Sequence, residues 1–247
     1  KKNYISAIVV ALSTEPTKHK KMLGHYRELL SGHLNQLNAV NKEQELSDTQ
    51  KKNWTKMAIL KNVAKTYSEK VKTIGEKPTK KEIATYQEYM LSLLYTEMPP
   101  LRNDYANMLM ITKEELDDMP KSSNYMVNNG LSYSVVLNQY KTDKYYGKQF
   151  INLPRKLYPV LKKWQKINPT KFFLINNKNE QLNNNALTKL LNKAFSSTGK
   201  KIGSSLIRHI YLSEKYEANE EEKKGDAIAM LHSVATQQGV YVKRIPK

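Results

Sequence analysis

The spacing of apolar residues changes twice along this 247-residue chain, and these changes constrain its fold more than any other feature. From about Pro16 to Leu94, apolar residues recur mostly at three- and four-residue steps, which is typical of amphipathic helices. After about residue 120 the pattern changes to short β-rich runs, and from Pro154 onward it returns to helix. We therefore predict a mainly α fold with one small antiparallel β-sheet, of the α+β class.

Local signals predict the bounds of the first elements. Helices are expected over about residues 16–37 and 47–67, the second opening at Ser47 and Gln50 with the spacing of a capping box. Residues 71–80 contain Gly75 and Pro78 and lack a periodic apolar face, so they are expected to form a linker. A helix with a second capping box should follow and end before Pro99-Pro100. The linker divides the chain into a helical domain, residues 1–77, and a second domain, residues 78–247.

The second domain should contain the sheet. Strands are expected at about residues 125–127, 133–137 and 149–153, the first two joined by the turn signal Asn128-Asn129-Gly130. A polar loop at residues 140–144 separates the second and third strands. Helices should follow around residues 157–164, 184–196, 203–217 and 220–231.

The charge of the chain favours a polyanionic partner. There are 41 Lys and Arg residues against 23 Asp and Glu, a formal net charge of +18. The excess is not confined to a tail, because residues 1–77 contribute +8 of it. Lys and Arg that neutralise phosphates release counterions, so the composition favours nucleic acid over a merely soluble basic surface.

Other functional classes are excluded by what the chain lacks. There is no cysteine, which excludes thiol catalysis, disulfides and Cys-ligated zinc. No apolar run approaches the ~20 residues that a membrane helix needs, so no membrane partner is expected. The chain has no P-loop and no acidic metal cluster, and we expect neither cofactor nor metal. It begins at Lys1 without an initiator Met, so we expect a fragment or a processed form.

The most informative segment is the last 45 residues. It contains Ser205-Leu-Ile-Arg208-His209, then Leu231-His232-Ser233, then Thr236-Gln237 and Tyr241. His232 lies 24 residues after Arg208, and Tyr241 lies nine residues after His232. This order and spacing resembles the C-terminal part of a tyrosine recombinase (integrase), in particular a divergent member of viral or mobile-element type.

The resemblance extends backwards from this segment. The family has a first arginine after the helix that precedes the sheet, and Arg102 follows Pro99-Pro100 at that place. It also has a lysine in a β-hairpin turn, where Lys141 stands, with Lys144 as an alternative. The specific resemblance covers about residues 80–247. For residues 1–77 it rests on position, helicity and charge, which match the family's DNA core-binding domain.

Two positions depart from the family pattern. Ser205 stands where the family usually has His, and Leu231 stands where Gly usually precedes the second His. His209 would share a helix face with Ser205 and could replace the missing imidazole, but we favour a packing role for it.

The side chains at these positions suit the DNA cleavage chemistry that the resemblance implies. Arg102 and Arg208 could grip the non-bridging oxygens of a phosphodiester, unless they pair instead with acids such as Asp104 or Glu214. Tyr241 would be the nucleophile and form a 3′-phosphotyrosine link, which keeps the bond energy for rejoining. By the resemblance, His232 would bind the phosphate or assist proton transfer, and Lys141 would protonate the departing 5′-oxygen.

The resemblance implies an enzyme that cleaves and rejoins double-stranded DNA during recombination or integration of a mobile element or viral DNA. Family members act as homo-oligomers, usually tetramers, on DNA, inside the compartment that holds it (a nucleus, viral factory or nucleoid). Three alternatives stay open. A type IB topoisomerase would share the same catalytic residues, and a hairpin-forming telomere resolvase is a less favoured relative. A DNA-binding protein with a decayed active site would explain Ser205 and Leu231.

Overall fold

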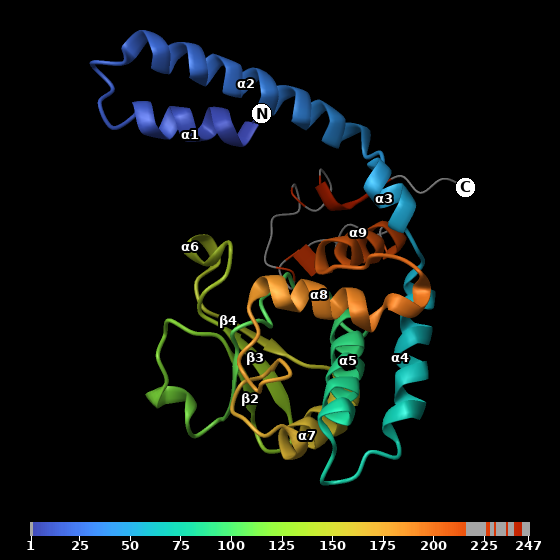
Figure 1. The fold of residues 1–247 in the computed structure, drawn as a ribbon. Helices are drawn as coiled ribbons and strands as arrows, with labels where there is room; N and C mark the ends of the chain where they lie inside the picture. Colours follow the sequence, from blue (N-terminus) through green and yellow to red (C-terminus); the bar gives the residue numbers. More distant parts are fainter. Residues whose placement is uncertain (1, 216–225, 228–229, 231–235, 237–239, 244–247) are drawn as a thin grey trace. The chain divides into compact units, whose positions relative to one another are not determined.

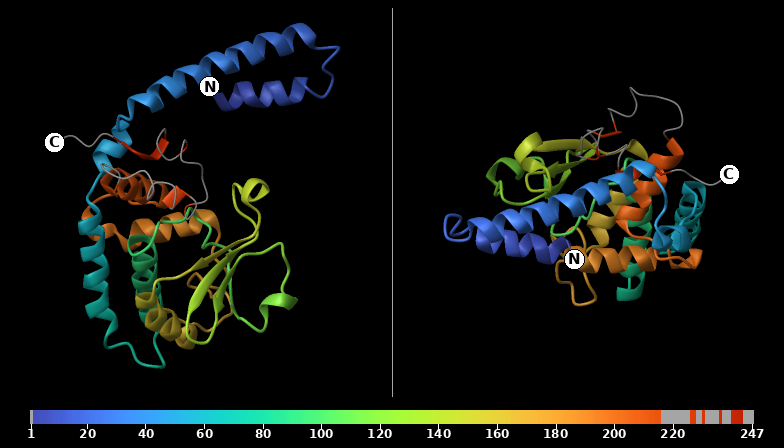
Figure 2. Two further views of the ribbon diagram at one scale, coloured as in Figure 1. Left: turned by 180° about the vertical axis from the view of Figure 1, so that it is seen from behind. Right: turned by 90° about the horizontal axis from the view of Figure 1, so that it is seen from above.

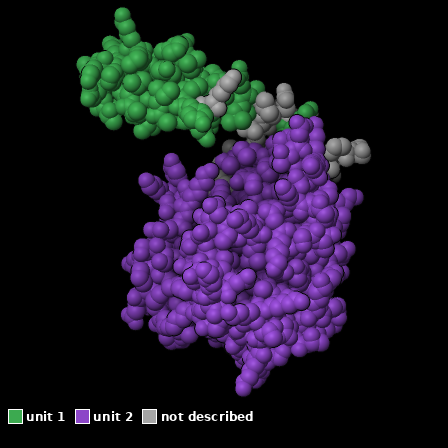
Figure 3. All heavy atoms as spheres, in the orientation of Figure 1, with its two compact units in different colours: residues 1–45, 246–247 green, residues 46–245 purple. Residues whose placement is uncertain are grey.

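The computed structural model describes residues 2–215, 226–227, 230, 236 and 240–243. The chain divides into two compact units, one formed by residues 1–45 and the other by Leu46–Ile245 (Figure 3). Within the part of the chain that the structure describes, no helix is both long and apolar enough to cross a membrane.

The first unit is a helical hairpin. Helix α1 (Lys2–Leu12) packs against α2 (Lys20–Glu43), and α1 has no buried residue. Among the described residues of this unit, only Leu23 is buried, while Tyr4 and Val10 are 79% and 70% exposed. Helix α1 was not predicted, and α2 begins four residues after the expected start.

The second unit contains the remaining helices, and its capping predictions are confirmed. Ser47 opens α3 (Asp48–Asn53) and Thr79 opens α5 (Lys80–Thr96), each with a complete capping box. The expected helix 47–67 is instead two helices, α3 and α4 (Met57–Val71), because Trp54 has an extended backbone. The later helices are α6 (Asp143–Tyr146), α7 (Tyr158–Ile167), α8 (Asn184–Ala194) and α9 (Ser204–Lys215), with 3-10 turns at Leu116–Asp118, Arg155–Leu157 and Ser196–Thr198.

The sheet has four strands, in the order β1-β2-β3-β4. The predicted strands are β2 (Tyr125–Asn128), β3 (Tyr133–Leu137) and β4 (Gln149–Asn152), and they pair antiparallel as expected. An unpredicted strand, β1 (Leu109–Thr112), pairs parallel to β2, so the sheet is mixed. The fold is α+β, with α5, α7 and α8 on one side of the sheet and the β1–β2 connection on the other (Figures 1 and 2).

One hydrophobic core joins α4 and α5 within the second unit. Leu60 and Val63 of α4 are buried with Met90 and Leu94 of α5 and with residues of α7, α8 and α9. The contacts place α4 in one unit with α5, so the division falls after residue 45, whereas the predicted domain boundary lies between residues 77 and 78. The assignment of residues 1–77 as a DNA core-binding domain stays a prediction. Apart from Asp226, Ala227 and Met230, the helix expected over 220–231 lies outside the described residues.

Candidate active site

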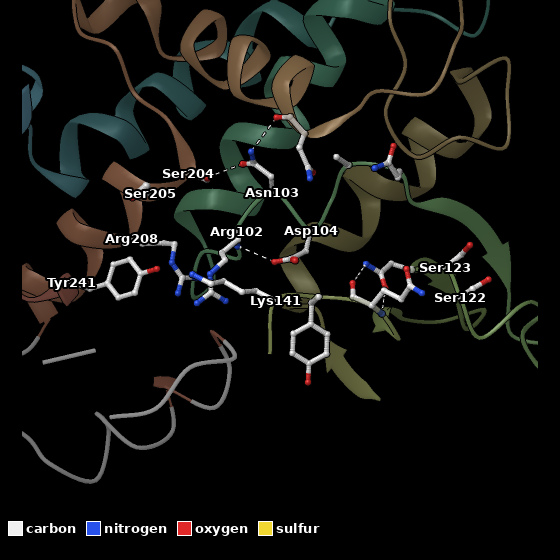
Figure 4. A pocket seen from close by; sticks show the side chains of 16 residues that line it. Arg102, Asn103, Asp104, Ser122, Ser123, Lys141, Ser204, Ser205, Arg208 and Tyr241 are labelled. Carbon is white, nitrogen blue, oxygen red and sulfur yellow. Dashed lines mark hydrogen bonds between the residues drawn. The ribbon is translucent and has the colours of Figure 1, made fainter. Parts of the chain in front are cut away.

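A pocket of about 570 Å³ opens in the second unit. It is lined by residues from the segment after α5, the β1–β2 connection, the end of β3, the start of α8, α9 and the Tyr241 segment. Among them are five of the six side chains singled out from the sequence: Arg102, Lys141, Ser205, Arg208 and Tyr241. In Figure 4, the side chains of Arg102, Arg208 and Lys141 converge on Tyr241.

Arg208 is a buried guanidinium on α9, only 1% exposed. Its Nη1 donates to the Pro100 carbonyl at 2.8 Å, and its Nη2 donates to the Met230 carbonyl at 3.4 Å. Burial lowers the pKa of this arginine, but the group stays charged because a guanidinium starts from so high a value. Glu214, one of its alternative partners, accepts instead from the backbone N–H of Met57, at 3.1 and 3.2 Å from its two oxygens.

Arg102 lies in the segment between α5 and β1, and its backbone is fixed on both sides. The Tyr95 hydroxyl, buried on α5, donates to the Arg102 carbonyl at 2.7 Å. The Arg102 N–H donates to Asp104 Oδ2 at 3.1 Å. Burial raises the pKa of the Asp104 carboxyl above its ordinary value, although the charges of Arg102 and Arg208 act in the opposite direction.

Asn103 fastens the same segment to two helices. Its Nδ2 donates to the Asn184 carbonyl at 3.0 Å and to Thr188 Oγ1 at 2.9 Å, both on α8. Its Oδ1 accepts from Ser204 Oγ, at the start of α9, at 2.7 Å. Asn103 and Ser204 were not singled out from the sequence. The only signal was a polar Asn-Asp pair after Arg102 in a segment that two prolines keep from being helical.

Tyr241 lies against both arginines. The Arg208 guanidinium carbon is 4.6 Å from the centroid of the Tyr241 ring. Burial raises the pKa of the phenol, but the charges of Arg208 and Arg102, and hydrogen bonds from both side chains, bring the net pKa below the ordinary value for tyrosine. The arrangement favours the phenolate, which is the nucleophilic form.

The backbone of Tyr241 is held by the next turns of α9. His209 Nδ1 is 2.9 Å from the Tyr241 carbonyl oxygen, and the two rings are 5.1 Å apart between centroids. Ser213 Oγ lies 3.5 Å from the same carbonyl and accepts from the Lys243 N–H at 2.8 Å. Burial lowers the pKa of His209 to about 4, so the imidazole is neutral near pH 7 and can donate from Nδ1.

Lys141, Lys144 and Ser205 have different positions around the pocket. Lys141 is exposed, lies just after β3 and lines the pocket, whereas Lys144 is exposed on α6 and does not line it. Ser205 is exposed in the first turn of α9 and lines the pocket. His232 and the neighbouring Leu231, together with Ser233 and Gln237, lie outside the described residues. Among the residues that the structure describes, no cluster of three or more His, Asp or Glu could hold a metal ion.

Comparisons with known proteins give limited similarity. No protein-family model and no curated protein matches the chain significantly. Among solved structures, the chain is similar to XerA recombinase, with a TM-score of 0.48 and 12% sequence identity. The similarity covers 81% of this chain and 58% of the recombinase chain, so this chain spans less than two thirds of that protein's length.

Proposed function

We propose that the chain cleaves and rejoins double-stranded DNA through a 3′-phosphotyrosine link to Tyr241, and that it serves site-specific recombination or integration. The observation that carries this proposal is the position of the Tyr241 ring, which lies 4.6 Å from the Arg208 guanidinium carbon in a pocket that Arg102 also lines. The formal charge of +18 supports DNA as the partner.

The two guanidiniums would bind the scissile phosphate. A pentavalent phosphorus transition state gathers negative charge on its non-bridging oxygens, and fixed cations stabilise that charge most when water is excluded. Arg208 is already buried, and the backbone of Arg102 is held by Tyr95 and Asp104, so the cost of ordering these residues during the reaction is reduced. Such preorganised electrostatic contacts are typically worth about 3–4 kcal/mol each in other enzymes.

The covalent step follows from the same arrangement. The Tyr241 hydroxyl gives up its proton to solvent and its oxygen attacks phosphorus. The bond from phosphorus to the 5′-oxygen breaks, and the 5′-oxygen takes a proton from Lys141. The product is a 3′-phosphotyrosine ester and a free 5′-hydroxyl, and the reverse reaction rejoins a strand without an external energy source. Lys141 lines the pocket whereas Lys144 does not, which favours Lys141 as the acid.

The test is covalent trapping. A nicked suicide duplex loses a short fragment after cleavage, so the protein–DNA adduct accumulates and is visible on a denaturing gel. We expect an adduct with the native chain and none with Tyr241→Phe. Tyr211→Phe, which removes another half-buried phenol on α9, is the matched control and should still form the adduct.

An adduct that survives in Tyr241→Phe would contradict the choice of nucleophile. Salt-sensitive DNA binding without any adduct would instead favour a DNA-binding protein with a decayed site. If the adduct forms, strand exchange between two duplexes by an oligomer would support recombination. Relaxation of supercoiled DNA by a monomer would identify a type IB topoisomerase.

A further inference from the structure

The connection between β3 and β4, together with the start of β4, presents aromatic side chains to solvent. Tyr145 is 86% exposed, Phe150 is 59% exposed and Tyr146 is 41% exposed, all within six positions. Figure 1 shows α6, which contains both tyrosines, at the outer end of this connection and away from the helical layer. Single exposed apolar residues are ordinary, but three exposed aromatics within six positions indicate a binding surface.

The backbone that presents these aromatics is ordered by its own hydrogen bonds. The Tyr140 hydroxyl donates to the Gly147 carbonyl at 2.7 Å and ties the two sides of the connection together. The Gly147 N–H donates to the Asp143 carbonyl at 2.7 Å and closes α6. Gly147 has φ 61° and ψ −161°, a region open essentially to glycine alone, so the sequence is suited to this turn.

Lysines alternate with the aromatics. Lys141, Lys144 and Lys148 lie in the same connection, where Asp143 is the only acid. The ammonium of Lys148 lies 4.6 Å from the centre of the Phe150 ring. Interleaved cations and stacking rings are the pattern with which proteins bind unpaired nucleotides, since every base offers a flat face and every nucleotide a phosphate.

The position of the surface relates it to the candidate active site. Lys141 links the two, because it lies in the same connection as the aromatic side chains and lines the pocket that contains Arg208 and Tyr241. A DNA strand that is bound in the pocket at Lys141 would therefore lie close to the aromatic side chains of the same connection. The net positive charge of the connection matches a phosphate backbone and opposes a basic partner such as a second copy of this chain.

We infer that Tyr145, Tyr146 and Phe150 form a stacking surface for unpaired DNA bases next to the cleavage site. The inference rests on the proposed function for its substrate, double-stranded DNA that is locally unpaired where the protein holds it. The surface would stabilise the unpaired state by stacking, while Lys144 and Lys148 contact the backbone of the same strand.

The experiment compares binding to two DNAs of the same sequence. One is a fully paired duplex and the other contains a central bubble of unpaired bases, both with a fluorescent end label read by anisotropy. The native chain should bind the bubble more tightly. In Tyr145→Ala/Phe150→Ala, affinity for the bubble should fall at least five-fold, since base–aromatic stacking is worth roughly 1–3 kcal/mol per base. Affinity for the paired duplex should change less than two-fold.

Two control variants separate stacking from other effects. Leu131→Ala removes a 94% exposed apolar side chain from the β2–β3 turn and should leave both affinities unchanged. Tyr145→Phe/Phe150→Tyr keeps both rings and should retain the bubble preference. Because stacking carries no charge, the double alanine variant should also keep the native dependence of affinity on salt concentration.

The results would decide the inference independently of the covalent chemistry. Equal losses on the bubble and the paired duplex, or no loss on either, would overturn the stacking surface. A bubble preference in a chain that forms no adduct would sustain the surface and contradict the proposed reaction. An adduct without any bubble preference would support the proposed reaction and overturn the stacking surface.

Discussion

Removal of the Tyr95 hydroxyl should weaken both the fold and the site. In Tyr95→Phe the ring remains in its fully buried position on α5, packed edge-on against Tyr105 at 5.5 Å between centroids. Only the hydrogen bond to the Arg102 carbonyl is lost, and this bond is short at 2.7 Å. The carbonyl is left short of a donor in a part-buried segment.

The expected loss of stability in Tyr95→Phe follows from the single hydrogen bond that is removed. A net contribution of 0.5–1.5 kcal/mol for the bond, with a share of the penalty for an unsatisfied carbonyl, gives a loss of about 1–2 kcal/mol in the free energy of unfolding. Tyr105→Phe provides a matched control. Its hydroxyl is equally buried, but it donates to Met98 Sδ at 3.7 Å, and a thioether is a weak acceptor. We expect a loss below about 0.5 kcal/mol there.

Urea denaturation followed by tryptophan fluorescence measures both variants. Trp164 is fully buried in the core of the second unit and donates to the Phe173 carbonyl at 2.9 Å, so its emission reports the unfolding of that unit. Tyr95→Phe should also slow adduct formation several-fold, because Arg102 loses one of its two backbone restraints. Equal destabilisation of the two variants, or a Tyr95→Phe chain as stable as the native one, would refute the reasoning.

Two further predictions concern the electrostatics of the second unit. Arg102→Met removes a charge that lowers the Tyr241 pKa, so the pH at which adduct formation reaches half its maximal rate should rise. Arg102→Lys keeps the charge and should stay nearer the native pH profile. An unchanged midpoint in Arg102→Met would contradict the role of the Arg102 charge. In Glu214→Ala, α4 loses the carboxylate that accepts from its first N–H, and the free energy of unfolding should fall by about 1 kcal/mol. Glu69→Ala, the control, removes an exposed i,i+3 ion pair with Lys72 at the other end of α4. The free energy of unfolding, measured by urea denaturation, should fall less than half as much as in Glu214→Ala. An equal loss in the two variants would mean that Glu214 does not act as a cap.

The features that the sequence predicted best are local. The capping boxes at Ser47 and Thr79 satisfy the first N–H groups of a helix with side chains three residues away, so their spacing is visible in the sequence. The same holds for β2 and β3, which are joined by an Asn-Asn-Gly turn. Such signals depend on no distant partner.

The features that the sequence did not predict depend on distant residues. The break between α3 and α4 coincides with an N-terminal contact from Glu214, 157 positions away. Strand β1 has only four residues and is held by β2 and by a hydrogen bond from Met110 to the Lys171 carbonyl. In the candidate site, Arg102, Lys141, Arg208 and Tyr241 were singled out from the sequence and line one pocket, while their catalytic roles stay predictions. The bond between Asn103 and Ser204 joins positions 101 apart and has no local signature.

For the proposed reaction, the way in which Tyr241 is held has a consequence for turnover. His209 and Ser213 contact its backbone carbonyl, whereas the arginines contact its phenol. The two ends of the residue are thus held by separate groups, and esterification of the phenol would alter only one of them. A covalent intermediate could then persist and be resolved while the peptide stays docked, so that cleavage and ligation share one geometry and no local unfolding step limits the reverse reaction.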